Sequence, residues 1–168
     1  CEAAHSVTIK DEGKIIAAAE IPAGERAVQL SAAGMKRWSP KTPYLYTVEV
    51  SAGEQKLSRR FGVRRLTVQG TKLYLNGEPY FFRGVCEHCY HPLTVHPTRE
   101  KNYYRRVIRT MKGLGFNSIR FHTYVPPMEY MEAADELGIL IEVETPNNTT
   151  YAEWQDIVRM ARRYTSPP

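Results

Sequence analysis

The stretch KLYLNGEPYFFRGV, residues 72–85, decides the fold, because the pattern of the sequence differs on its two sides. It holds the pair Asn76-Gly77 between two runs that are rich in aromatic residues. Both central residues of a type I′ turn need positive φ, which asparagine and glycine adopt readily, so the pair predicts a β-hairpin. A strand is therefore expected to begin near Tyr80, and FFRGVC, residues 81–86, opens the alternation of strands and helices that follows.

Before this stretch, apolar and polar residues alternate in short runs that are mostly separated by glycine or proline. A period of two predicts antiparallel β-strands. Five runs show it: SVTI (6–9), KIIAAAEI (14–21), RAVQLS (26–31), YLYTVEV (44–50) and QKLSRRFGV (55–63). A complete immunoglobulin-like sandwich has about seven strands. These residues therefore predict an incomplete one.

After this stretch, short apolar strands alternate with amphipathic segments of helical period. The expected order is strand 81–86, helix 98–114, strand 117–122, helix 127–137, strand 139–144 and helix 151–163. Thr98 is the expected N-cap of the first helix and Gly115 its stop. In the second helix, Pro127 suits the first turn and Gly138 is the expected stop. The alternation predicts parallel strands joined by right-handed crossovers, the arrangement of an α/β sheet or of a (β/α)8 TIM barrel.

The expected fold class is therefore multidomain, β plus α/β. A partial immunoglobulin-like β-sandwich is expected in residues 1–66, followed in residues 67–168 by an α/β part that is either an open sheet or the N-terminal part of a TIM barrel. A closed barrel needs eight βα units, and three are predicted here. An open barrel leaves strand edges unpaired, so we expect the sequence to be a piece of a larger enzyme.

Polar residues gather where each predicted parallel strand ends. They are Glu87, His88 and His91, then Arg120, His122 and Tyr124, then Glu142 and Glu144. In parallel α/β folds the chemistry takes place at these ends. Three neighbouring strands would bring the residues to one rim, so they are candidates for a single binding site. Such residues also serve merely to cap helices or to satisfy loop backbone, and this alternative stays open for each of them singly.

The stretch GVCEHCYHPLTVHP, residues 84–97, raises a metal site as another alternative. Its ligands for tetrahedral zinc would be Cys86, Cys89, His91 and His96. Zinc folds usually place the second ligand pair a dozen or more residues away. The expectation is therefore no metal, with Cys86 and Cys89 as packed thiols. A thioredoxin-type pair would open a helix, which His91-Pro92 disfavours.

Composition and charge narrow the class of protein. With 42% apolar content in 168 residues the chain can bury a core, and no apolar run approaches the roughly 18 residues that span a bilayer. The formal net charge of +5 is scattered, and the nearest basic cluster, YYRRVIRTMK (103–112), fits one flank of a helix. Nucleic acid is therefore not an expected partner. Neither a cofactor nor a targeting segment is indicated, a periplasmic or extracellular location is favoured, and a homo-oligomer is left open.

Five motifs resemble, in order, glycoside hydrolase family 2, the class of β-galactosidases and β-glucuronidases. They are WSPKTPYLYTVEV (38–50), FGVRR (61–65), LYLNGEPYFFRGVCEH (73–88), LGFNSIRFHTYVPP (114–127) and YMEAADELGILIEVE (130–144). The resemblance covers about residues 38–146. It implies an immunoglobulin-like sandwich followed by the start of a TIM barrel, with the boundary near residues 65–70.

The resemblance also implies binding residues. The family's Gly-Val-Asn-Arg-His-Glu segment is similar to residues 84–89, which matches His88 to a histidine of the substrate pocket. The family's Arg-Thr-Ser-His-Tyr-Pro segment is similar to the stretch that starts at Arg120. There the arginine fits, and His122 stands one place early, as in a subgroup with Arg-Phe-His and a double proline. Glu144 is similar to the family's acidic residue at the end of strand three, so these four residues are the expected substrate-binding set.

The resemblance implies a fragment of a retaining glycoside hydrolase that cleaves O-glycosidic bonds of oligo- or polysaccharides, with a carbohydrate as its partner. The family's two catalytic glutamates, after strand four and on strand seven, fall beyond residue 168, so no catalytic residue is expected here and the fragment alone should be inactive. The alternative is a non-catalytic carbohydrate-binding or interaction module of the same fold. An Asn-Glu at strand four and a glutamate at strand seven would favour the enzyme.

Overall fold

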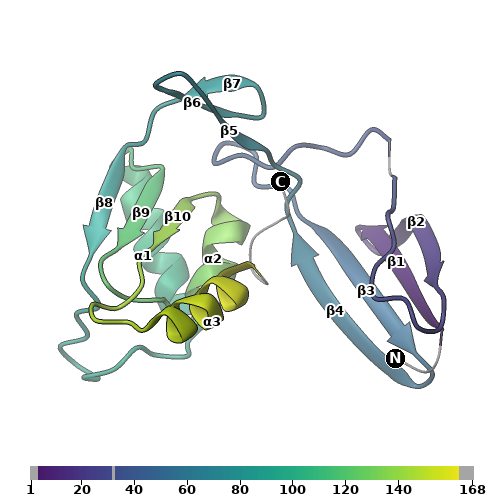
Figure 1. The fold of residues 1–168 in the computed structure, drawn as a ribbon. Coiled ribbons are helices and arrows are strands. Elements are labelled where there is room, and N and C mark those ends of the chain that lie inside the picture. Colours follow the sequence, from purple (N-terminus) through teal and green to yellow (C-terminus); the bar gives the residue numbers. More distant parts are fainter. Residues whose placement is uncertain (1–3, 32, 163–168) are drawn as a thin grey trace. The chain divides into compact units, whose positions relative to one another are not determined.

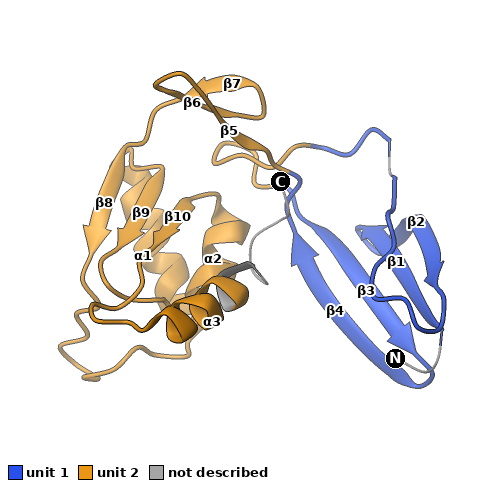
Figure 2. Cartoon of the chain, in the orientation of Figure 1, with its two compact units in different colours: residues 1–36, 44–63 blue, residues 37–43, 64–168 orange. Residues whose placement is uncertain are grey.

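The computed structural model describes residues 4–31 and 33–162. The chain divides into two compact units, which Figure 2 shows in different colours. Unit 1 holds residues 1–36 and 44–63, and unit 2 holds residues 37–43 and 64–168. The described elements of unit 1 are β-strands, whereas unit 2 combines strands with helices. The expected combination of a β part and an α/β part is therefore confirmed.

Unit 1 contains an antiparallel sheet in the order β2-β1-β3-β4 (Figure 1). Its strands are β1 (His5–Asp11), β2 (Lys14–Ile21), β3 (Tyr46–Ala52) and β4 (Gln55–Phe61). Four of the five expected runs are therefore strands, and the strand expected at residues 26–31 is wrong. Because β1 and β3 are paired on both sides, only the outer edges of β2 and β4 could take another strand, and residues 26–31 pair with neither.

The predicted hairpin is part of a three-stranded antiparallel sheet at the start of unit 2. Its strands are β5 (Leu66–Gln69), β6 (Lys72–Leu75) and β7 (Glu78–Tyr80). Leu75 pairs with Glu78, and Asn76 and Gly77 between them have φ values of 57° and 91°. Both central residues therefore have the positive φ of a type I′ turn, which confirms the hairpin.

The second sheet of unit 2 is parallel, in the order β10-β9-β8 (Figure 1). Its strands are β8 (Gly84–Glu87), β9 (Ser118–Phe121) and β10 (Leu140–Val143). The parallel pairing of the three predicted strands is thus confirmed. β8 begins at Gly84 rather than at Phe81, because the Asn117 side chain binds the preceding backbone. Asn117 Oδ1 accepts the N–H of Arg83 at 2.8 Å, and its Nδ2 donates to the carbonyl of Phe81 at 2.9 Å.

Three helices follow the parallel strands: α1 (Lys101–Gly113), α2 (Met128–Leu137) and α3 (Tyr151–Arg162). Gly138 is the left-handed C-cap of α2, as expected, whereas Pro127 is its N-cap rather than part of its first turn. The end expected for the third helix, Arg163, lies outside the described residues. None of the helices in the described part of the chain is long and apolar enough to cross a membrane.

Thr98 is not the N-cap of α1, contrary to expectation. That position belongs to Glu100, whose side chain makes no capping hydrogen bond. Thr98 Oγ1 instead accepts the N–H of Glu100 at 3.1 Å, and the Thr98 carbonyl accepts the Tyr104 hydroxyl at 2.6 Å. A local bond from a threonine side chain to nearby backbone stabilises a turn that competes with helix.

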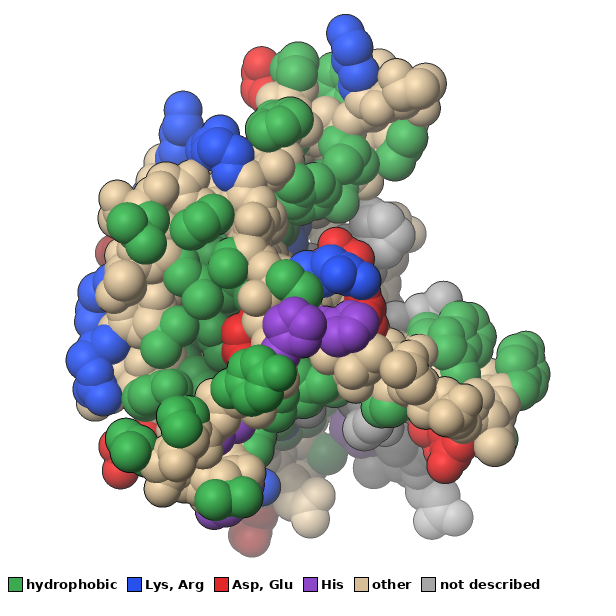
Figure 3. Space-filling model, turned by 90° about the vertical axis from the view of Figure 1, so that its left-hand side faces the viewer, with side chains coloured by type: hydrophobic (Ala, Val, Ile, Leu, Met, Phe, Trp, Pro, Cys, Tyr) green, Lys and Arg blue, Asp and Glu red, His purple; other side chains and the backbone are tan. Residues whose placement is uncertain are grey.

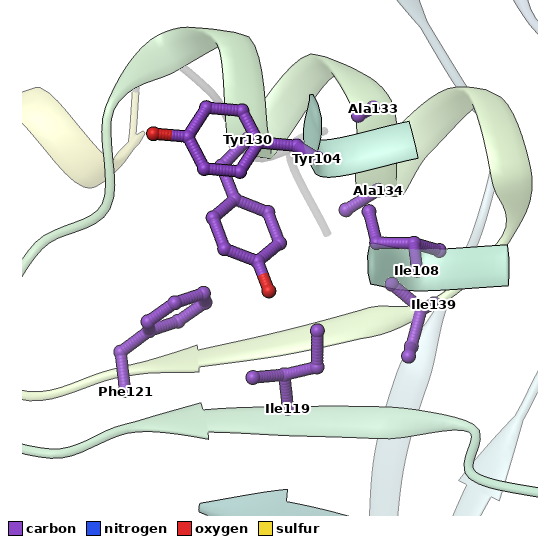
Figure 4. Close-up of a cluster of buried hydrophobic side chains, with 8 residues drawn as sticks. All are labelled: Tyr104, Ile108, Ile119, Phe121, Tyr130, Ala133, Ala134 and Ile139. Carbon is purple, nitrogen blue, oxygen red and sulfur yellow. The ribbon is translucent and has the colours of Figure 1, made fainter. Parts of the chain in front are cut away.

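The core of unit 2 lies where α1 and α2 pack on the parallel sheet (Figure 4). Its buried members are Tyr104, Ile108, Ile119, Phe121, Tyr130, Ala133, Ala134 and Ile139. Tyr130 stacks on Tyr104 with ring centroids 4.4 Å apart and meets Phe121 edge-on at 5.0 Å. The two helices are also joined by a salt bridge between Arg105 and Glu136 at 2.6 Å. These contacts fix the strands whose ends carry the candidate site.

Two glycines with positive φ give a matched test of this packing. A Cβ at Gly138 (φ +77°) would lie 2.7 Å from the carbonyl oxygen of Pro40, whereas Gly115 (φ +89°) has nothing within 4 Å. Gly115→Ala should cost about 1 kcal/mol of unfolding free energy for the left-handed conformation. Gly138→Ala should cost about 2–3 kcal/mol, because a backbone clash adds to that strain. Urea titrations followed by far-UV circular dichroism measure both losses, and equal losses would contradict the close contact with Pro40.

Candidate functional site

The candidate site begins on the face of the parallel sheet that does not pack on α1 and α2. Neighbouring residues of a strand point to opposite faces. Ile119 of β9 packs in the core. The next residue, Arg120, therefore lies on the opposite face, beside its partners Cys86 of β8 and Glu142 of β10, and all three are exposed. Arg120 Nη1 lies 3.8 Å from the Cys86 sulfur, and Arg120 Nε lies 3.7 Å from Glu142 Oε1. Arg120 thus contacts a residue of each neighbouring strand.

Glu144, directly after β10, binds two of the three residues that were expected at the end of β9, Arg120 and His122. Its Oε1 forms an ion pair with Arg120 Nη2, and its Oε2 lies 3.0 Å from His122 Nδ1. Oε2 also accepts the backbone N–H of Thr123 at 3.0 Å. Both carboxylate oxygens of Glu144 are therefore engaged by groups of this chain.

His88 joins this group from the loop after β8. Its ring centroid lies 4.9 Å from that of His122 and 6.0 Å from that of Tyr90, on which it stacks. Histidine side chains lie beside basic and acidic side chains on the face shown in Figure 3. The structure thus brings together His88, Arg120, His122 and Glu144, and their role in substrate binding stays a prediction.

The other polar residues at the strand ends have local contacts. Glu87 Oε1 accepts the N–H of Cys89 at 2.6 Å, and the Glu87 carbonyl accepts the N–H of His122 at 2.9 Å. The ring of Tyr124 packs edge-on against Phe121 at 5.4 Å. The carbonyl of His91 accepts the N–H of Val95 at 2.7 Å. These contacts stabilise the loops that follow β8 and β9.

The two cysteines of the CxxC motif are free, Cys86 exposed and Cys89 partly buried. The expectation of a packed thiol is wrong for Cys86, because its side chain belongs to the uncovered face of the sheet. Cys89 has a φ of +60°, which turns the chain out of its extended path. Among residues 4–31 and 33–162, no group of three or more histidine, cysteine, aspartate or glutamate side chains could hold a metal ion.

The sequence did not point to Thr123, although its backbone N–H is one of the donors to Glu144. Thr123 has a φ of +54°, a conformation that threonine rarely adopts. No glycine or asparagine marks this turn, so no sequence signal could have identified it. The turn directs an N–H group at the carboxylate beside His122.

The environment of Glu144 favours its ionised form. The pKa of its carboxyl lies below the ordinary value of 4.5, chiefly because the Thr123 N–H donates to it. The charge of Arg120 and the hydrogen bond from His122 lower the pKa further, whereas partial burial acts in the opposite direction. Glu144 is therefore a carboxylate that accepts hydrogen bonds and has little tendency to donate a proton.

This pKa shift predicts a pH dependence of stability. Folding lowers the pKa of Glu144. Its contribution to the free energy of unfolding is therefore fully present above the pKa that this carboxyl has in the unfolded chain, and it is lost as pH falls through the pKa in the folded chain. The unfolding free energy of the wild type should therefore decrease more steeply than that of Glu144→Gln as pH falls below about 4.5. Urea titrations over this pH range measure the two slopes, and parallel slopes would contradict the shift.

The arrangement is that of α/β folds that carry their binding side chains at the carboxyl ends of parallel strands. The family follows from the sequence. Residues 66–167, more than half of the chain, match the family model described as "Glycosyl hydrolases family 2, TIM barrel domain". Residues 2–64 match the model described as "Glycosyl hydrolases family 2". The chain therefore belongs to glycoside hydrolase family 2, as its motifs indicated.

Known relatives agree with this assignment. The chain is 31% identical to a β-galactosidase of Photobacterium profundum over 144 residues, which is 77% of this chain and 14% of that protein. It is 32% identical to a β-galactosidase of Vibrio cholerae over 70% of this chain and 12% of that protein. Among solved structures, the β-glucuronidase from Ruminococcus gnavus in complex with D-glucuronic acid matches 87% of this chain and 26% of its own, with a TM-score of 0.76 and 26% identity. The chain spans 11% to 24% of the lengths of such curated relatives.

Proposed function

We propose that this chain is part of a longer retaining glycosidase, to which it contributes one side of the sugar pocket. In this proposal residues 1–66 belong to an immunoglobulin-like sandwich, and residues 67–168 supply the first three βα units of the barrel. Membership of glycoside hydrolase family 2 supports the proposal. So do the relatives, which are named as β-galactosidases and a β-glucuronidase.

One observation carries the assignment of the pocket: His88, Arg120, His122 and Glu144 meet at the ends of three adjacent parallel strands. Sugar hydroxyls both donate and accept hydrogen bonds. The guanidinium of Arg120 is a donor, and an imidazole is a donor at one nitrogen and an acceptor at the other. Arg120 is already balanced by Glu144 and Glu142, so the cluster needs no anionic ligand to neutralise it.

The two catalytic carboxyls are proposed to come from other parts of the longer protein. Retaining glycosidases place two carboxyl groups about 5 Å apart, one as acid/base and one as nucleophile. Glu144 has a lowered pKa and both of its oxygens are bonded. The lowered pKa makes Glu144 a poor general acid, and the engagement of both oxygens leaves neither of them free to attack as a nucleophile. Arg120, His88 and His122 would instead hold the sugar in position for attack, which lowers the entropic part of the barrier.

The test is to read the coding sequence on both sides of this chain and to assay the complete protein on a panel of p-nitrophenyl glycosides. The panel should include the β-galactoside and the β-glucuronide. The proposal expects release of p-nitrophenol from at least one of them, an Asn-Glu at strand four, a glutamate at strand seven, and no activity of residues 1–168 alone. A complete protein that lacks both glutamates and cleaves none of the panel would contradict a hydrolase and leave the non-catalytic carbohydrate-binding module.

A further inference from the structure

We propose that Glu144 is a positioning residue that fixes the Nδ1–H tautomer of His122, so that the ring offers its Nε2 lone pair to a sugar hydroxyl. The part that concerns the sugar rests on the proposed function. The part that concerns the tautomer rests on geometry alone. It assigns Glu144 a different task from direct contact with substrate.

The first step is the saturation of the Glu144 carboxylate. Oε1 is paired with Arg120, and Oε2 receives the N–H of Thr123 and faces His122 Nδ1, both at 3.0 Å. The side chain of Glu144 is 23% exposed, whereas those of Arg120 and His122 are 47% and 41% exposed. The carboxylate is thus the inner partner, and the cation and the imidazole are the groups that a ligand can reach.

The second step concerns the proton. An ionised carboxylate has only lone pairs to offer, so the ring nitrogen that hydrogen-bonds to it must carry the hydrogen. When the imidazole is neutral, Nδ1 is then the donor and Nε2 is the acceptor, because the bond made by one nitrogen decides the protonation of the other. Within the described residues, Nε2 of His122 has no hydrogen-bond partner, so its lone pair is available to a hydroxyl donor.

The third step is the response to removal of the acceptor. Oε2 serves both the Thr123 N–H, which is a fixed backbone donor, and His122 Nδ1. In Glu144→Gln the amide oxygen can keep the place of Oε2 while the new NH2 faces Arg120, so the tautomer of His122 should be kept. In Glu144→Leu no acceptor remains beside Nδ1, so the Nδ1–H tautomer should no longer be fixed.

The experiment measures the ring 15N shifts of His122 in residues 1–168 by long-range 1H–15N correlation, at a pH where the imidazole is neutral. Comparison with His122→Gln assigns the ring among the five histidines. The wild type and Glu144→Gln should show a protonated Nδ1 and a bare Nε2, and Glu144→Leu should lose this pattern. Glu142→Gln is the matched control, because Glu142 is 67% exposed and pairs with Arg120 rather than with His122; it should keep the wild-type pattern.

A bare Nδ1 in the wild type would overturn the inference, and so would a fully protonated Nδ1 that persists in Glu144→Leu. If the tautomer also changed in Glu142→Gln, the charge near Arg120, rather than the hydrogen bond to Glu144, would decide which ring nitrogen of His122 carries the hydrogen. A purely structural role of Glu144 would leave the tautomer unmoved. The experiment contains no sugar, so its failure is distinct from failure of the complete protein to cleave glycosides.

Discussion

Replacing Arg120 with methionine in the complete protein should lower kcat/KM by about 100- to 1,000-fold, the loss typical of a group whose donors act on the transition state. Arg120 touches groups from both neighbouring strands, through Cys86 and Glu142 on either side and Glu144 at the strand end. Its removal takes away the donors proposed for the sugar and leaves two carboxylates without their cation. The measurement is the initial rate on whichever p-nitrophenyl glycoside the wild type cleaves.

Two further variants make the Arg120 prediction specific. Arg120→Lys keeps the charge but loses the planar fork of donors, so its kcat/KM should fall between those of the wild type and Arg120→Met. Arg109→Met removes an exposed cation from α1 and should leave kcat/KM unchanged. Wild-type activity in Arg120→Met would contradict the placement of the sugar at these strand ends.

Replacing Trp38 with alanine should cost unit 2 about 3–5 kcal/mol of unfolding free energy, the usual loss for a buried large aromatic. Trp38 is fully buried. Its indole N–H donates to the carbonyl of Asp135 in α2 at 2.8 Å, and the guanidinium of Arg64 lies 4.7 Å from its ring centroid. The substitution therefore removes packing and the hydrogen bond from the indole N–H to α2.

Trp154 provides the matched control, because it is the second of the two tryptophans and is 44% exposed. Trp154→Ala should change the unfolding free energy by less than about 0.5 kcal/mol. Within residues 4–31 and 33–162, the helices lie in unit 2, so far-UV circular dichroism during a urea titration follows this unit. Equal losses in the two variants would contradict the role of Trp38 in the packing of residues 37–43 on α2.

Much of the α/β part was predictable because local patterns and topology agree there. The Asn76-Gly77 pair has a single strong interpretation, and strands that alternate with helices can pair in parallel only through crossovers. Once the strands are parallel and adjacent, their ends must meet at one edge. For this reason the meeting of Arg120, His122 and Glu144 could be expected from the sequence, although none of the distances could.

The wrong expectations, and the features that the sequence did not indicate, depend on contacts that a local sequence pattern does not determine. Residues 26–31 alternate like a strand, but no free edge binds them. Thr98 has the right residue type for an N-cap, yet its hydroxyl oxygen accepts the N–H of Glu100 in the turn before the helix. The bond from Trp38 to Asp135 joins residues 97 positions apart, and the Thr123 N–H depends on a backbone turn that no residue type marks.

The central claim is that the ends of β8, β9 and β10 form one side of a sugar pocket. The most direct measurement is a crystal structure of the complete protein with a bound sugar, obtained with the product of whichever glycoside it cleaves. The account predicts sugar hydroxyls within about 2.6–3.2 Å of nitrogen atoms of Arg120 and His122, with Glu144 bonded to both side chains and not to the sugar. A sugar that occupies a site remote from these strand ends would contradict it.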